Sequence, residues 1–188
     1  MSDIPRKPLS EDLRFLVRKY PRETWTGHEN LGQTGAFWLQ RHNMFRELGA
    51  SIREATGDFR EQKTEANEFL QWMAPRLQFF LSQLEGHHHV EDLHYFPVFR
   101  AAEVRLGKGF DILDNDHEWL DGNLHTTAEV ANAMIRALQA GSDAEAAIQA
   151  YADQVDRLNA AMLSHLRDEE DLIIPLILDR TEAKLGIA

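Results

Sequence analysis

The stretch YADQVDRLNAAMLSHLRDEEDLIIPL, from Tyr151 to Leu176, decides the fold class. Its apolar positions recur in alternating steps of three and four residues, which places them along one stripe of an α-helix. The stripe consists of Tyr151, Val155, Leu158, Met162, His165, Glu169, Leu172 and Leu176. The stretch therefore predicts a long amphipathic helix that carries a histidine and a glutamate where apolar side chains are expected.

Three further segments have the same helical period: residues 35–56, 61–102 and 110–140. Gly57 is a typical residue at the end of a helix and predicts where the first segment stops. Pro75 predicts a kink in the second segment, or a short helix followed by a longer one. Ser142 and Glu145 form a capping-box pattern, which predicts the start of the fourth helix.

The connections between these segments are short, which favours antiparallel neighbours. No segment has a convincing strand pattern. The sequence thus predicts an all-α protein, an antiparallel up-down-up-down four-helix bundle over residues 35–180. Residues 1–34 are expected to form an N-terminal arm with a short helix from Ser10 to Tyr20, packed on the bundle, and residues 181–188 a C-terminal tail.

Composition excludes several classes of protein. The formal net charge of −11 has the wrong sign for a nucleic-acid-binding surface. No apolar run is long enough to span a membrane, and the start MSDIPRKPLSEDLRF predicts no secretory signal, so we expect a cytoplasmic protein without a membrane partner. The chain has no cysteine, which excludes disulfides, thiolate metal sites and thiol catalysis.

Five polar residues occupy positions of the apolar stripes: His42, Glu91, His117, His165 and Glu169. An unpaired carboxylate is very costly to bury, so several of them in one small core require compensation. A bound cation would satisfy these groups directly. The polar stripe positions therefore predict a metal site inside the bundle.

The spacing of these residues supports a metal site. His87–Glu91 and His165–Glu169 each place a histidine and a glutamate four residues apart, on one helix face and roughly 6 Å apart along the axis. His42 and His117 would join them from the other two helices. Imidazole and carboxylate donors suit iron, manganese or zinc, and this set exceeds the needs of one tetrahedral zinc, which indicates two metals.

An internal repeat relates the two histidine–glutamate pairs. HHHVEDLHYFP, from His87 to Pro97, aligns without a gap with HLRDEEDLIIP, from His165 to Pro175. Both segments share the first histidine, the glutamate four residues later, the acidic residue after it and the final proline. The chain thus consists of two copies of a helix pair, and each copy supplies one histidine followed by a His-x-x-x-Glu motif.

These motifs resemble those of the hemerythrin-like, or HHE cation-binding, family over about residues 35–180. The resemblance implies an antiparallel four-helix bundle with an oxo- or hydroxo-bridged pair of iron ions, for which zinc or manganese could substitute. It also implies two roles for the six residues. The terminal ligands would be His42, His87, His117 and His165, and the bridging carboxylates would be Glu91 and Glu169.

The sequence departs from the oxygen-carrying hemerythrins at two places. The carriers have a second histidine four residues after the one at His117, where this chain has Asp121. Their last carboxylate would fall on Glu170, but Glu169 lies on the apolar stripe and is the better candidate. One metal is therefore expected to be ligated differently, and three side chains could complete its coordination: His88, Asp121 and His125.

Other polar residues are expected to have ordinary roles. His28 is predicted at the surface or in an ordinary hydrogen bond, and His89 and His94 are predicted at the surface or beside the metal ligands. Asp168, Glu170 and Asp171 are predicted to form a solvated helix face. Most aromatic residues are expected in the core, and Tyr95, one turn beyond Glu91, is expected near the metal ligands.

We therefore expect a non-haem di-iron protein that binds or senses a small diatomic molecule (O2 or NO) or the redox state, or that handles iron, rather than an enzyme. The first alternative is a ferritin-like di-iron oxidase. Its Glu-x-x-His motif occurs at Glu85–His88 and Glu91–His94, but not in the fourth helix. The second alternative is a helical interaction module stabilised by zinc.

Overall fold

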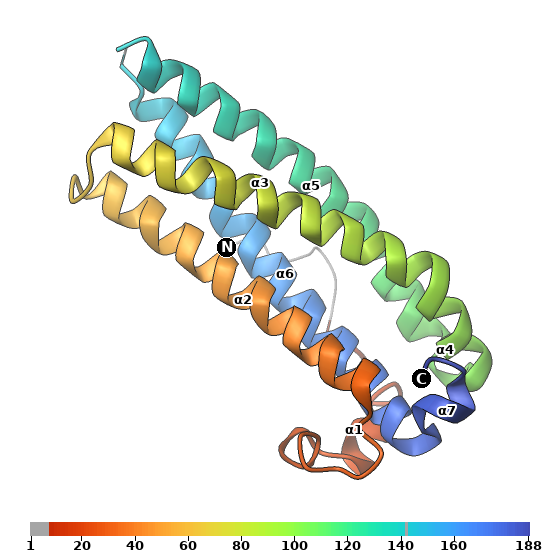
Figure 1. The fold of residues 1–188 in the computed structure, drawn as a ribbon. Helices are drawn as coiled ribbons and strands as arrows, with labels where there is room; N and C mark the ends of the chain where they lie inside the picture. Colours follow the sequence, from red (N-terminus) through yellow and green to blue (C-terminus); the bar gives the residue numbers. More distant parts are fainter. Residues whose placement is uncertain (1–7, 142) are drawn as a thin grey trace.

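A computed structural model describes residues 8–141 and 143–188. Four long helices lie side by side in one bundle (Figure 1). They are α2 (Gln33–Arg60), α3 (Ala66–Val90), α5 (Gly107–Gln139) and α6 (Glu145–Arg180). The short helices α1 (Phe15–Lys19), α4 (Phe96–Ala102) and α7 (Glu182–Leu185) gather at one end of the bundle. The predicted four-helix bundle with a short N-terminal helix is confirmed.

The first two long helices differ from the prediction at their ends. α2 continues through Gly57 to Arg60, and the chain turns only at Gln62, where φ is 58°. Gly57 was wrongly predicted as the stop because the left-handed backbone that favours glycine occurs five residues later. α3 runs through Pro75 without interruption, and the expected division of the second helix occurs instead at a π turn, Glu91–Tyr95.

The starts of the last two helices also need correction. α5 begins at Gly107, and the connection before it contains a 3₁₀ turn, η3 (Val104–Leu106), started by Glu103, whose side chain accepts the backbone N–H of Arg105. Ser142 lies outside the described residues. Glu145 is the first residue of α6 rather than its third, and its backbone N–H donates to Asp143 Oδ1 over 3.1 Å.

The hydrophobic core is divided into two clusters along the bundle. The first includes Phe45, Leu84, Leu120 and Met162, and the second includes Trp38, Phe96, Leu113 and Leu172. On each helix the predicted metal-binding residues lie between the members of the two clusters. A polar layer therefore crosses the bundle between two apolar layers, which exclude bulk water from it.

The N-terminal arm packs on the bundle as expected. The side chains of Leu13, Leu16 and Trp25 are buried in the second apolar cluster. A second 3₁₀ turn, η1 (Arg22–Thr24), follows α1 and is held by Trp25, whose indole Nε1 donates to the Tyr20 carbonyl over 2.8 Å. Among the described helices, none is both long enough and apolar enough to cross a membrane.

Candidate metal centre

The structure brings all seven predicted metal-binding residues into the polar layer. They form two adjoining groups, and in each group the possible ligand atoms lie within 4.8 Å of one another. The first group is His88, His117 and His165, and the second is His42, His87, Glu91 and Glu169. Every long helix of the bundle, or the π turn that extends α3, contributes to this layer.

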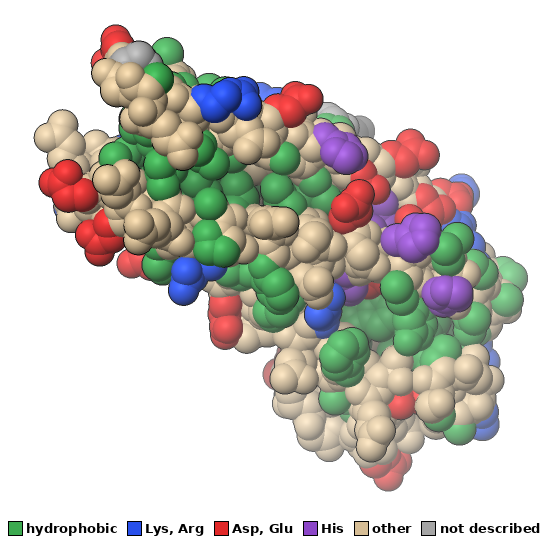
Figure 2. Space-filling view, turned by 45° about the horizontal axis from the view of Figure 1, so that its top comes forward, with side chains coloured by type: hydrophobic (Ala, Val, Ile, Leu, Met, Phe, Trp, Pro, Cys, Tyr) green, Lys and Arg blue, Asp and Glu red, His purple; other side chains and the backbone are tan. Residues whose placement is uncertain are grey.

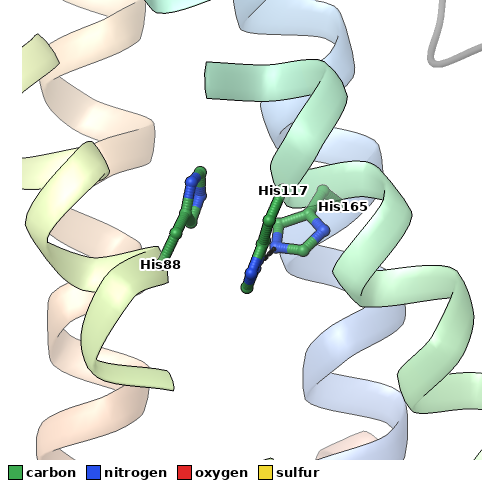
Figure 3. Close-up of side chains that lie close together, drawn as sticks. All are labelled: His88, His117 and His165. Carbon is green, nitrogen blue, oxygen red and sulfur yellow. Dashed lines mark hydrogen bonds between the residues drawn. The ribbon is translucent and has the colours of Figure 1, made fainter. Parts of the chain in front are cut away.

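The histidines approach each other through their Nε2 atoms. His42 Nε2 and His87 Nε2 are 3.0 Å apart, and so are His117 Nε2 and His165 Nε2. The latter pair comes from α5 and α6 and meets in the space between the helices (Figure 3). Each pair directs two ring nitrogens at one point, as two ligands of a shared cation do.

The two glutamates each span both histidine groups. Glu91 places Oε1 3.0 Å from His87 Nε2 and Oε2 3.6 Å from His117 Nε2. Glu169 places Oε1 3.4 Å from His42 Nε2 and Oε2 3.1 Å from His165 Nε2. Each carboxylate therefore presents one oxygen to each group, which is the arrangement of a carboxylate that bridges two cations.

His88 completes the three-histidine group. Its ring stacks on that of His117, with centroids 4.2 Å apart, and points into the space shared with His165 (Figure 3). Of the other two candidates, His125 is exposed, and Asp121 lies 3.2 Å from His88 Nδ1, on the side of the ring away from Nε2. The geometry therefore places His88 in the group, with Asp121 orienting it.

A π turn follows α3 at the site. It spans Glu91–Tyr95 and so begins at one of the two glutamates, and such turns are frequent at functional sites. The extra residue advances the register, so that Phe96 and Phe99 are buried beyond the site, whereas the predicted stripe residue Val98 is only half-buried. The periodicity of the sequence alone did not reveal this shift.

Four of the histidines hold a carboxylate on the ring nitrogen that faces away from the site. The Nδ1 contacts are His42–Glu170 (3.0 Å), His88–Asp121 (3.2 Å), His117–Asp92 (2.7 Å) and His165–Asp116 (3.3 Å). A carboxylate at Nδ1 fixes the ring with its Nε2 lone pair toward a metal and raises its basicity. Sequence reasoning assigned no such role to Asp92 or Asp116, although each directly adjoins a predicted ligand in the sequence.

The predicted solvated face of α6 is wrong. Asp168, Glu170 and Asp171 are all buried, and the N-terminal arm covers Glu170 and Asp171. Arg22 pairs with both Glu170 and Asp171, and Arg14 pairs with Asp171, each over 2.8 Å. The sequence predicted that the arm packs on the bundle, but not that its arginines lie against the acidic residues of α6.

The remaining histidines do not join the layer. His89 and His94 are exposed, as predicted, and Figure 2 shows surface histidines among acidic and hydrophobic side chains on one part of the face in view. His28 is half-buried, and its Nδ1 accepts the backbone N–H of Asn30 over 3.1 Å. Tyr95 contacts the site through Trp38, whose ring centroid is 5.0 Å away.

Burial and neighbouring charges shift the ionisation of the polar layer. Burial, with the neighbouring His117, lowers the pKa of His88 to about 3, so this ring is neutral and able to bind a cation. Burial raises the pKa of Glu91 well above its usual range, and the adjacent Glu169 adds to the effect. Burial alone would lower the pKa of His165, but Asp116 and Glu169 outweigh it and raise that pKa to about 9.

Several atoms of the layer lack hydrogen-bond partners within the described part of the chain. They are His88 Nε2, both carboxylate oxygens of Glu91, and Glu169 Oε2. The histidine Nε2 atoms that lie 3.0–3.6 Å from these oxygens do not have the geometry of a hydrogen bond to them. Buried polar atoms are almost always hydrogen-bonded, and here four unsatisfied acceptors converge in one layer. Cations at the two groups would satisfy all of them, so the residues fit a metal centre.

The sequence profile described as the Hemerythrin HHE cation binding domain matches residues 35–177. The chain belongs to this family. The match covers the four long helices and confirms the resemblance inferred from the motifs. Searches of curated proteins and of solved structures found no significant match.

This protein is thus an HHE cation-binding domain whose buried histidine and glutamate clusters indicate a metal site. The structure assembles the seven predicted residues in that site, and their individual roles as ligands stay a prediction.

Proposed function

We propose that this HHE domain is a non-haem di-iron protein of hemerythrin type, which binds or senses a small diatomic molecule or handles iron. The observation that carries the proposal is the span of the two glutamates, since Glu91 and Glu169 each offer one oxygen to each histidine group. A single cation does not need that arrangement. Two irons held there would supply reversible one-electron chemistry and affinity for O2 or NO.

The two positions differ in their protein donors. One is faced by three histidines and the other by two, His42 and His87, each with an oxygen from both glutamates. The position with two histidines has fewer protein ligands and therefore more room for an exogenous one. This asymmetry favours ligand binding over a purely structural role.

A small cavity reaches the two-histidine position. It has a volume of about 220 Å³ and is lined by His87 and Glu91 on one side and by Phe37, Trp38 and Tyr95 on another. Larger hollows occur elsewhere, such as one of about 900 Å³ beside Gln62, but its lining includes none of the histidines. The small volume of this cavity favours a small ligand over a bulky organic substrate.

Residues of the chain hold the site and shield it. Trp38 Nε1 donates to Glu169 Oε1 over 2.6 Å, which fixes one bridging carboxylate. The same indole packs against Phe99 and Tyr95, with ring centroids 5.9 and 5.0 Å away, and so covers the layer on the side of the cavity. Trp38 thus orients a ligand and excludes water at once.

The alternatives make different demands on the site. A ferritin-like oxidase would use the two Glu-x-x-His motifs, but Glu85 and His94 are both exposed. Zinc is the second candidate, because His88, His117 and His165 alone offer three donors to a tetrahedral ion. We propose no catalytic reaction.

The test is metal analysis of freshly purified protein together with its absorption spectrum. We expect about two irons per chain and near-ultraviolet charge-transfer bands. Glu91→Gln is expected to lose most of the iron, because it removes an anionic bridge, whereas Glu85→Gln, at an exposed position of α3, is expected to keep it. Zinc at about one per chain, with no iron taken up under anaerobic reconstitution, would contradict the di-iron proposal.

A further inference from the structure

The N-terminal arm contacts the outer side of the metal layer through Arg22. This guanidinium lies 4.7 Å over the ring of Trp25, which is itself buried. Arg22 Nη1 donates to Glu170 Oε2 and Nε donates to Asp171 Oδ1, each over 2.8 Å, and Nη2 donates to the Arg167 carbonyl over 2.6 Å. The planar fork is therefore fixed in orientation by three acceptors of α6.

Glu170 connects this arginine to the site. Its second oxygen, Oε1, lies 3.0 Å from His42 Nδ1 and 2.7 Å from Arg46 Nη2. On the other side of the same ring, His42 Nε2 points at His87 Nε2, 3.0 Å away in the metal layer. The arm, the carboxylate and a predicted ligand thus form one continuous chain of contacts.

We propose that Arg22 is a positioning residue for the metal site, and that docking of the N-terminal arm and binding of the cation stabilise each other. The inference rests on the metal site proposed above, but not on the identity of its metal. Glu170 orients His42 while its carboxylate is itself held, by Arg46 of α2 at Oε1 and by Arg22 of the arm at Oε2. A cation on Nε2 makes the Nδ1–H of His42 a stronger donor to Glu170, which in turn strengthens the contact with Arg22.

Coupling of this kind is reciprocal, because a cation that favours the docked arm must be bound more tightly when the arm is docked. In a sensing protein, the docked arm is then the segment that reports whether the site is filled.

Arg14 provides a matched control for Arg22. It also comes from the arm and pairs with α6, with Nη2 2.8 Å from Asp171 Oδ2. The two guanidinium side chains are similarly exposed, at 36% for Arg14 and 40% for Arg22. Of these two arginines of the arm, however, Arg22 pairs with Glu170 and Arg14 pairs only with Asp171 in the described residues. If the arm merely covered the bundle, replacing either arginine would change the affinity for the metal equally.

The first measurement is the affinity of the full chain for zinc(II), and for iron(II) under anaerobic conditions, by competition with a chelator. Removing a direct partner of a ligating histidine costs about 10–100-fold in affinity, so Arg22→Gln, one contact further out, is expected to weaken binding about 3–10-fold. Arg14→Gln is expected to stay within about twofold, and Arg22→Lys to restore part of the loss. Equal effects from Arg14→Gln and Arg22→Gln, or no effect from either, would overturn the coupling.

The reciprocal measurement is the rate of tryptic cleavage after Arg18 and Lys19, both exposed in the arm. Zinc(II) is expected to slow this cleavage in the unaltered protein and in Arg14→Gln, but not in Arg22→Gln. Circular dichroism confirms that each variant is folded. If the unaltered protein binds the metal but its arm is cleaved at the same rate with and without it, the coupling alone is wrong. If it binds neither metal, the site itself is wrong and the coupling with it.

Discussion

Replacing His165 by alanine tests whether the polar layer binds metal, and its effect on stability can be worked out from linkage. His165 is fully buried and lies in the three-histidine group. Loss of a residue that only orients a ligand can weaken metal binding by roughly 100-fold. Loss of a direct ligand is expected to weaken it at least as much. With metal at about 100 times the Kd of the unaltered protein, binding adds about 2.7 kcal/mol to the free energy of unfolding, and a 100-fold weaker site adds only about 0.4 kcal/mol.

This difference is large enough to measure by thermal unfolding. In a chain of this size, 1 kcal/mol shifts the melting temperature by about 2–4 °C, so the increase in Tm caused by metal should shrink by roughly 5–9 °C in His165→Ala. The comparison uses Tm with and without metal for each protein. The loss of packing from removing the imidazole is present in both measurements and cancels.

The matched control is His125→Ala, at an exposed position on the neighbouring helix α5. It is expected to retain the full metal-dependent increase in Tm. An unchanged increase in His165→Ala at the same metal concentration would refute the assignment of His165 to the site. Equal losses in both variants would show that the metal binds elsewhere.

Two further predictions concern the frame around the site. Gly49→Ala would place a Cβ 2.5 Å from the buried Asn159 Oδ1, so we expect urea unfolding to show a loss of about 1–3 kcal/mol. Gly86→Ala, inside α3 with no atom within 4 Å, is expected to gain about 0.5–1 kcal/mol instead, because alanine favours the helix over glycine. The side chain of Arg105 lowers the pKa of Glu103 to about 2, from an ordinary 4.5. The contribution of the ionised Glu103 to stability is therefore fully present above about pH 4.5 and is lost as the pH falls through about 2. The difference in unfolding free energy between the unaltered protein and Glu103→Gln should accordingly shrink between about pH 5 and pH 3, and a constant difference would contradict the assigned pKa.

The bundle could be predicted from the sequence because its helices are amphipathic over their whole length. Alternating steps of three and four residues fix which side chains face inward. His42, His117 and His165 occupy positions in this repeat, as the neighbouring leucines do. The same periodicity placed Glu91 and Glu169 in the layer. Residues that share a stripe must meet when the stripes meet, so these five members of the layer followed from the periodicity. His87 followed from the spacing of the histidine–glutamate pairs, and His88 was one of three candidates to complete the coordination.

The helix boundaries were less predictable, because they depend on local backbone geometry. The chain passes Gly57 in helical conformation and turns at Gln62 instead. The general preference for glycine at helix ends does not reveal this. The π turn at Glu91–Tyr95 inserts one residue into the repeat. Both Val98 and Phe99 are apolar, so the sequence could not show which of them continues the stripe.

The outer partners of the histidines were missed for a different reason. Asp116 lies on α5 and its partner His165 on α6, so their contact is set by how two helices are placed against each other. The same holds for Asp92 with His117 and for the arm over Glu170. Helix periodicity gives the direction of each side chain, but not which residue of a neighbouring helix lies opposite.

The polar layer and the residues around its histidines are rich in carboxylates. The two inner glutamates are joined by four outer carboxylates on the histidine Nδ1 atoms, and in the described part of the chain Arg22 and Arg46 both pair with one of these, Glu170. Such a concentration of acidic groups in and around a core is costly unless something offsets it. The outer carboxylates direct the imidazoles and strengthen their Nε2 donors, which explains their place beside the histidines. A core designed only for stability would place apolar side chains there, and the cost of this one is compensated when cations fill it.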